Sequence, residues 1–144
     1  MADPSTEQRR ANAVLFRKFI DQYGPGVLAI LRENTIEETC QKYQQANIPT
    51  RDLLTLKAML WDVLSDRFEC VTEEATPTRL KMRVTRCPFA DDMIAFRAAD
   101  IGYALYCCYD YGFCQGFNPS MRFIRTTTLM QGDDCCDHTY ELDE

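Results

Sequence analysis

The fold of this 144-residue chain is decided by one stretch, Arg79-Leu80-Lys81-Met82-Arg83-Val84-Thr85-Arg86, in which polar and apolar side chains alternate strictly. Leu80, Met82 and Val84 share one face, and the basic side chains share the other. An alternation of period two is typical of a β-strand with one buried and one wetted face. The stretch therefore predicts a strand, and the shorter alternation over 68–72 predicts its partner in a hairpin.

On the N-terminal side of this stretch, apolar residues recur at helical spacing. The pattern predicts three helices, over 5–23, 25–46 and 50–64. Thr50 is the expected N-cap of the third helix, because its hydroxyl can accept a hydrogen bond from a free backbone N–H. We therefore expect residues 5–65 to be helical, and no catalytic pattern occurs in them.

On the C-terminal side, Cys87-Pro88 ends the strand, because proline cannot donate to the ladder. Asp91 or Asp92 can cap the helix that follows, in one or two pieces. Gly112 and Gly116 are expected to break that helix, because glycine is a poor helix former. Two further strands are predicted over 121–130 and 135–141, with a turn at 131–134.

The predicted elements run in the order three helices, hairpin, helix, hairpin. That order is typical of an α+β fold, here with a helical N-terminal third followed by an antiparallel sheet with a packed helix. The length fits a single domain over residues 1–144, in which 5–65 are helical and 68–141 are α+β.

Charge and hydropathy narrow the range of partners. The net charge is −6 and the pI about 4.8, whereas a duplex-binding surface needs clustered basic charge, so we expect no nucleic-acid partner. No uncharged apolar run approaches the roughly 18 residues of a membrane span, so we expect no membrane partner. The first residues lack the basic and apolar segments of a secretory signal, which predicts a cytoplasmic protein. A small-molecule substrate and a homodimer through the N-terminal helix remain as expected partners.

Cysteine is the anomaly of the composition, with eight residues. Thiols stay reduced in the cytoplasm, so we expect no structural disulfide. Free cysteine often packs as a small apolar side chain, and this is the expected role of Cys40, Cys70 and Cys108. The remaining thiols are candidates for chemistry.

Three elements each supply soft or acid–base groups. Cys107 and Asp110 are one helical turn apart, so they share a face. Cys136 and His138 are two residues apart on a predicted strand, so their side chains point to the same side. Cys87 ends a strand next to the helix. From spacing alone each thiol also fits a packing role, but together these five residues predict a site.

Two chemistries fit this set. Thiolates with an imidazole and a carboxylate suit a divalent metal such as zinc. Alternatively, one cysteine is a nucleophile activated by the histidine and oriented by a carboxylate. Arg122 or Arg125 can bind a substrate carboxylate through a bidentate pair. Asn118, and Tyr103 on the same helix face as Cys107, complete the predicted substrate-binding residues.

Several short motifs occur in an order that resembles one family. They are Arg86-Cys87-Pro88-Phe89-Ala90-Asp91, Cys107-x-x-Asp110, Gly116-Phe117-Asn118-Pro119, Arg125-Thr126-Thr127-Thr128-Leu129 and Gly132-Asp133-Asp134-Cys135-Cys136-Asp137-His138. Over residues 68–141 the chain is similar to the L-2-amino-thiazoline-4-carboxylic acid hydrolase family. The resemblance implies opening of the ring of a cyclic cysteine precursor, which gives carbamoyl-cysteine on the way to cysteine.

The closing hairpin is also similar to the vinyl-reductase-type ligand-binding domain, which in some sensor proteins holds zinc through cysteines and an acidic residue. That likeness implies Cys87, Cys107, Asp110 and Cys136 as metal ligands. His138 stands where an aromatic residue is more usual, which points to a changed ligand set. Two functions stay open: a hydrolase of a small cyclic sulfur and nitrogen compound, and a non-enzymatic small-molecule or metal sensor.

Overall fold

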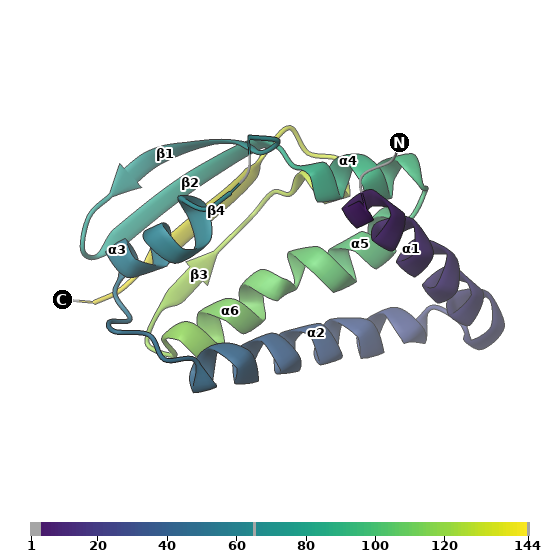
Figure 1. The fold of residues 1–144 in the computed structure, drawn as a ribbon, viewed down its shortest axis with the longest axis horizontal. Coiled ribbons are helices and arrows are strands. Elements are labelled where there is room, and N and C mark those ends of the chain that lie inside the picture. Colours follow the sequence, from purple (N-terminus) through teal and green to yellow (C-terminus); the bar gives the residue numbers. More distant parts are fainter. Residues whose placement is uncertain (1–3, 65, 144) are drawn as a thin grey trace.

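The structure is a computed structural model that describes residues 4–64 and 66–143. It is an α+β fold with a four-stranded antiparallel sheet in the order β1-β2-β4-β3. The strands are β1 (Glu69–Ala75), β2 (Arg79–Arg86), β3 (Arg122–Ile124) and β4 (Cys136–Glu141). Figure 1 shows the sheet at one end of the molecule, α1, α4 and α5 at the other end, and α2 and α6 running side by side.

The alternating stretch forms β2, as predicted, with Leu80, Met82 and Val84 buried. Strand β4 pairs with β2 antiparallel, which sets Met82 opposite His138 and Val84 opposite Cys136. Side chains that stand opposite each other in a sheet lie on the same face. The register therefore carries Cys136 and His138 onto the buried face of the sheet.

The N-terminal third is helical, as predicted, and its described residues contain no strand. It consists of α1 (Pro4–Tyr23), α2 (Gly26–Gln45), α3 (Leu53–Leu56) and the π-helical turn η1 (Lys57–Trp61); Ser65, in the predicted range, lies outside the described residues. The predicted cap at Thr50 is wrong. Asp52 caps α3, because its carboxylate accepts the backbone N–H of Thr55 at 2.8 Å and the helix starts later than expected.

The second helical region also differs from its prediction. It comprises α4 (Pro88–Ala95), α5 (Ala99–Gly102), the π-helical turn η2 (Tyr103–Cys107) and α6 (Tyr109–Phe117). Helix α4 begins at Pro88, so Asp91 and Asp92 lie inside it and do not cap it. Gly112 and Gly116 lie within α6 and do not break it. They are needed because α2 packs closely: a Cβ at Gly112 would lie 2.5 Å from the Ile36 carbonyl oxygen.

The strand predicted over 121–130 is much shorter in the structure. Strand β3 ends at Ile124, and the chain then forms a loop and the 3₁₀ turn η3 (Leu129–Gln131). The carboxylate of Asp137 on β4 accepts the backbone N–H groups of Thr126 and Thr127 at 2.8 and 2.7 Å, in place of ladder bonds. This side-chain bonding bends the chain away from the sheet just after Arg125.

The described residues pack around two apolar clusters. One lies between the sheet, α3, η1 and α6, and the other lies between α1, α4, α5 and η3. Cys87 and Leu129 pack against both clusters. Across residues 4–64 and 66–143, none of the helices has the length and apolar character to cross a membrane.

Candidate active site

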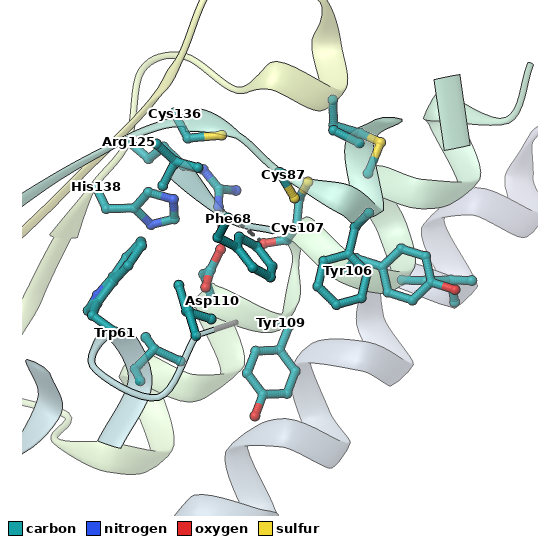
Figure 2. Close-up of a pocket in the computed structure, with 17 residues that line it drawn as sticks. Trp61, Phe68, Cys87, Tyr106, Cys107, Tyr109, Asp110, Arg125, Cys136 and His138 are labelled. Atoms are coloured by element: carbon teal, nitrogen blue, oxygen red, sulfur yellow. Dashed lines mark hydrogen bonds and ion pairs between the residues drawn. The ribbon is translucent and has the colours of Figure 1, made fainter. Parts of the chain in front are cut away.

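A cavity of about 440 Å³ lies where η1, the sheet, α4, η2 and the start of α6 meet. Most of its lining is aliphatic or aromatic. The charged, imidazole and thiol side chains that line it are those of Cys87, Cys107, Asp110, Arg125, Cys136 and His138 (Figure 2). The five residues predicted to converge from the sequence thus all line this one cavity.

Each of these side chains is placed by a different element. Cys87 follows β2 and precedes α4, Cys107 ends η2, and Asp110 lies in the first turn of α6. Cys136 and His138 lie on β4 and reach the cavity from the buried face of the sheet.

An ion pair joins Asp110 and Arg125 in the cavity. Nη1 of Arg125 donates to Oδ2 of Asp110 at 2.7 Å and to the Cys107 carbonyl oxygen at 3.2 Å. The side chain of Arg125 is only 2% exposed, whereas that of Asp110 is 18% exposed. Nη2 of Arg125 is buried and has no hydrogen-bond partner among the residues that the structure describes. A buried unpaired donor is costly, so a ligand oxygen within hydrogen-bond reach of this atom would be stabilised.

Aromatic rings hold the Arg125 guanidinium in position. It lies 5.0 Å from the ring centre of Tyr111, 5.4 Å from that of Phe123 and 5.8 Å from that of Tyr103. A cation over aromatic faces is attracted by the ring quadrupoles. The guanidinium is therefore preorganised on the cavity wall with one donor still unused.

Burial raises the pKa of Asp110 to about 6, and the positive charge of Arg125 opposes this shift. The pKa rises because the cavity stabilises the ionised carboxylate less well than water does. A carboxylate that titrates near neutral pH can accept a proton during a reaction and release it again. Asp110 is therefore the acid–base candidate of the site.

The thiols at the cavity are less reactive than the sequence suggested. Burial raises the pKa of Cys87 and Cys107, and it raises the pKa of Cys136 to about 11, although the Leu129 N–H donates to the Cys136 sulfur at 3.2 Å. The thiolate is the nucleophilic form, so these groups are protonated thiols at neutral pH. All eight cysteines are free in the structure.

His138 is buried, with 6% of its surface exposed, and its ring packs edge-on against Trp61 at 4.9 Å between ring centres. Burial, followed by the positive charge of Arg125, lowers the pKa of His138 to about 3. The imidazole is therefore neutral at physiological pH. A group that resists protonation is poorly suited to the role of proton carrier that the sequence predicted.

The four predicted metal ligands all line the same cavity. In the described part of the chain, no group of three His, Cys, Asp or Glu side chains is arranged to hold an ion. Asp110 also already pairs with the cationic guanidinium of Arg125 at 2.7 Å, so a metal ion at this carboxylate would have to compete with a positive charge. The prediction of zinc or another divalent metal is therefore not supported by this arrangement.

Of the four predicted substrate-binding residues, Arg125 alone is among the residues that line the cavity. Arg122 is exposed on β3 and pairs with Glu141 and Asp143. Asn118 builds a turn, in which its amide donates to the Arg51 carbonyl and accepts the Ser120 N–H. Tyr103 acts behind the site, through its ring contact with Arg125.

Sequence reasoning missed most of the aromatic lining, which includes Phe68, Phe89, Tyr106 and Tyr109. Trp61 is also part of the cavity wall. The Asp110–Arg125 pair was also missed, because it joins residues of α6 and the loop after β3. The signal for this pair in the sequence was Arg125 itself, a single arginine between Ile124 and Thr126.

The structure is a small α+β fold with a largely apolar cavity that carries a buried ion pair. The family model of L-2-amino-thiazoline-4-carboxylic acid hydrolase matches residues 6–140, so the chain belongs to this family. The match includes the helical N-terminal third, which the sequence motifs did not cover. No curated protein and no solved structure matches the chain.

Proposed function

We propose that this protein is a hydrolase that opens a small cyclic sulfur and nitrogen compound, similar to the ring opening of 2-amino-thiazoline-4-carboxylate towards cysteine. The observation that carries the proposal is the Asp110–Arg125 pair inside the apolar cavity, together with the family to which the chain belongs. The pair offers one acid–base group and one unused cationic donor at the same point.

The two charged groups match the two ends of such a substrate. The unpaired Nη2 of Arg125 would bind the substrate carboxylate, since guanidinium–carboxylate hydrogen bonds are short and strong. The amidine carbon, between nitrogen and sulfur, would then lie near Asp110. In the low-dielectric cavity, both contacts gain strength relative to water.

The reaction needs one water and one proton relay. Asp110 would take a proton from the water as its oxygen bonds to the amidine carbon. The C=N electron pair moves to the ring nitrogen during this attack. The bond from carbon to sulfur then breaks, Asp110 returns its proton to the departing sulfur, and the second proton of the water moves from the new oxygen to the ring nitrogen as the carbonyl forms. Water is consumed, and the product is a carbamoyl-cysteine with a free thiol. The relay requires a carboxyl group with a pKa near the working pH, as burial provides at Asp110.

A second candidate is a non-enzymatic module that binds a small molecule. The mostly apolar lining and the protonated thiols favour this reading, because they stabilise a ligand without attacking it. The two candidates share the site and differ only in turnover.

Turnover is tested with the purified chain and 2-amino-thiazoline-4-carboxylate, with carbamoyl-cysteine quantified by mass spectrometry. We expect product above the uncatalysed rate, and a value of kcat/KM that rises with pH and levels off above an apparent pKa of about 6. Absence of product from folded protein across this pH range would contradict hydrolysis and favour the binding module.

A further inference from the structure

The cavity is larger and more apolar than the family's named substrate requires. Its volume of about 440 Å³ lies within the roughly 300–1,000 Å³ of sites that enclose drug-sized ligands. An amino-thiazoline carboxylate has only about nine non-hydrogen atoms, which is far below drug size. Bound at the Asp110–Arg125 pair, it would leave most of the apolar lining without a partner.

The unfilled part of the cavity contains a row of aromatic rings. Phe68 packs against Phe89 at 5.8 Å between ring centres, and Phe89 stacks on Tyr106 at 5.1 Å. Helix α1 supports this row from behind: the Arg9 guanidinium lies 4.8 Å from the Phe89 ring centre, and Asn12 donates to the Tyr106 hydroxyl at 3.1 Å. The row is therefore held in place before any ligand binds.

The aromatic row extends across the cavity away from the ion pair: in Figure 2 Phe68 is drawn beside Asp110, and Tyr106 lies on the far side. Figure 2 shows Arg125 and His138 on one side and Tyr106 on the other, with Cys87 and Cys107 between them. All five line the cavity. A ligand that fills the space thus needs a charged head and an apolar extension that passes the two thiols, whose sulfur atoms make favourable contacts with aromatic rings.

We propose that the physiological ligand is a cyclic amidine carboxylate that carries an aromatic substituent, with its charged head at Asp110 and Arg125 and its aryl group against Phe68, Phe89 and Tyr106. The inference rests on the proposed function for the head. The C4 carboxylate is assigned to Arg125 and the C2 amidine to Asp110, which leaves C5 as the ring carbon free to carry a further substituent. The aryl group is assigned to that position because aromatic pairs gain energy beyond burial alone.

Trp61 is the only tryptophan and lines the cavity, so its fluorescence reports occupancy without requiring turnover. The probes are 2-amino-thiazoline-4-carboxylate, its 5-phenyl derivative, and octanoate as an alkyl-chain carboxylate. We expect the phenyl compound to bind about tenfold to a hundredfold more tightly than the unsubstituted one, because a phenyl-sized group leaves water. Equal affinity of these two, or tighter binding of octanoate than of the phenyl compound, overturns the proposal.

A substitution in the aromatic row tests whether the phenyl group binds there. Phe68→Ala should bring the ratio of the two thiazoline affinities toward one. Val71→Ala is the matched control: Val71 is 59% exposed on β1, away from the cavity lining, and its removal should keep the wild-type ratio. An unchanged ratio in Phe68→Ala contradicts the assignment. If Phe68→Ala does not fold by circular dichroism, Phe68→Leu replaces it.

The same samples separate this inference from the proposed function. If the phenyl compound binds more tightly and neither ring opens, the hydrolase proposal fails and the ligand class stands. If the unsubstituted ring opens and both compounds bind equally, the hydrolase proposal stands and the aryl assignment fails. Product detection by mass spectrometry and Trp61 fluorescence therefore give independent answers.

Discussion

Two buried arginine–aspartate pairs in this molecule have the same nitrogen–oxygen distance, through Nε of Arg9 and Nη1 of Arg125. Arg9 bonds Asp92 and Arg125 bonds Asp110, each at 2.7 Å, and both arginines are almost fully buried, with 6% and 2% of the side chain exposed. Within the described residues, Nη2 of each arginine lacks a hydrogen-bond partner. Each guanidinium also lies over an aromatic ring. Geometry alone does not distinguish a structural pair from a functional one.

The surroundings of the two pairs are different. Asp92 also accepts the Thr6 hydroxyl at 2.9 Å, so this pair ties α1 to α4. Asp110 lines the large cavity, and burial raises its pKa to about 6. The comparison teaches that a buried ion pair becomes a candidate site only where a ligand can reach it and where the carboxylate titrates near neutral pH.

The largest difference between the two pairs is expected when their carboxylates are replaced. Asp110→Asn should lower kcat for thiazoline opening by about 10²–10⁴-fold, the usual contribution of a general acid–base group. Asp92→Asn, the matched control, should retain wild-type kcat within about twofold because it lies outside the site. Rates are followed by mass spectrometry of the product. An equal loss in both folded variants would show that the pairs do not differ in function.

The second largest effect is expected at the Arg9–Asp92 pair, and it is an effect on stability. Arg9→Met removes one partner and leaves the Asp92 charge partly buried, which should lower the free energy of unfolding by about 3 kcal/mol. Urea unfolding followed by circular dichroism measures this change. The kcat of the folded fraction should not change. A stability like that of the wild type would show that the Asp92 carboxylate is well solvated without Arg9.

His138 reports the environment around the Asp110–Arg125 pair. Its folded pKa of about 3 lies below the ordinary 6.5, so the unfolded chain binds more protons and stability falls as the pH drops from about 6.5 to 3. Between pH 7 and 5 the loss should be about 2 kcal/mol. His138→Gln removes this contribution, so the difference in unfolding free energy between the wild type and the variant should shrink by that amount at pH 5. A difference independent of pH would place the imidazole in a wetter environment.

The smallest expected effect is that of a chelator. Because Arg125 occupies the Asp110 carboxylate, dialysis against EDTA should leave thiazoline turnover within about twofold of the untreated protein. Metal analysis before and after dialysis is the control. Loss of turnover together with a bound metal, and recovery on adding zinc, would restore the cysteine and aspartate ligand set that the sequence predicted.

The parts of the fold that the sequence predicted are those set by local periodicity. The alternation in β2 and the helical spacing of the first third are properties of neighbouring residues, and the structure confirms both. The prediction that Gly112 and Gly116 break the helix was wrong because it also used local sequence alone. Their role depends on how closely α2 approaches, and no local pattern contains that distance.

For the site, the spacing of residues along the chain already indicates which side chains share a face of a helix or strand. Helical spacing joins Cys107 to Asp110, and strand spacing joins Cys136 to His138. Only the tertiary structure decided their chemistry. The loop that Asp137 holds brings Arg125 to Asp110. Burial raises the pKa of Asp110, keeps the thiols protonated and keeps His138 neutral. Desolvation depends on everything packed around a group, so acid–base behaviour emerges only once the chain has folded.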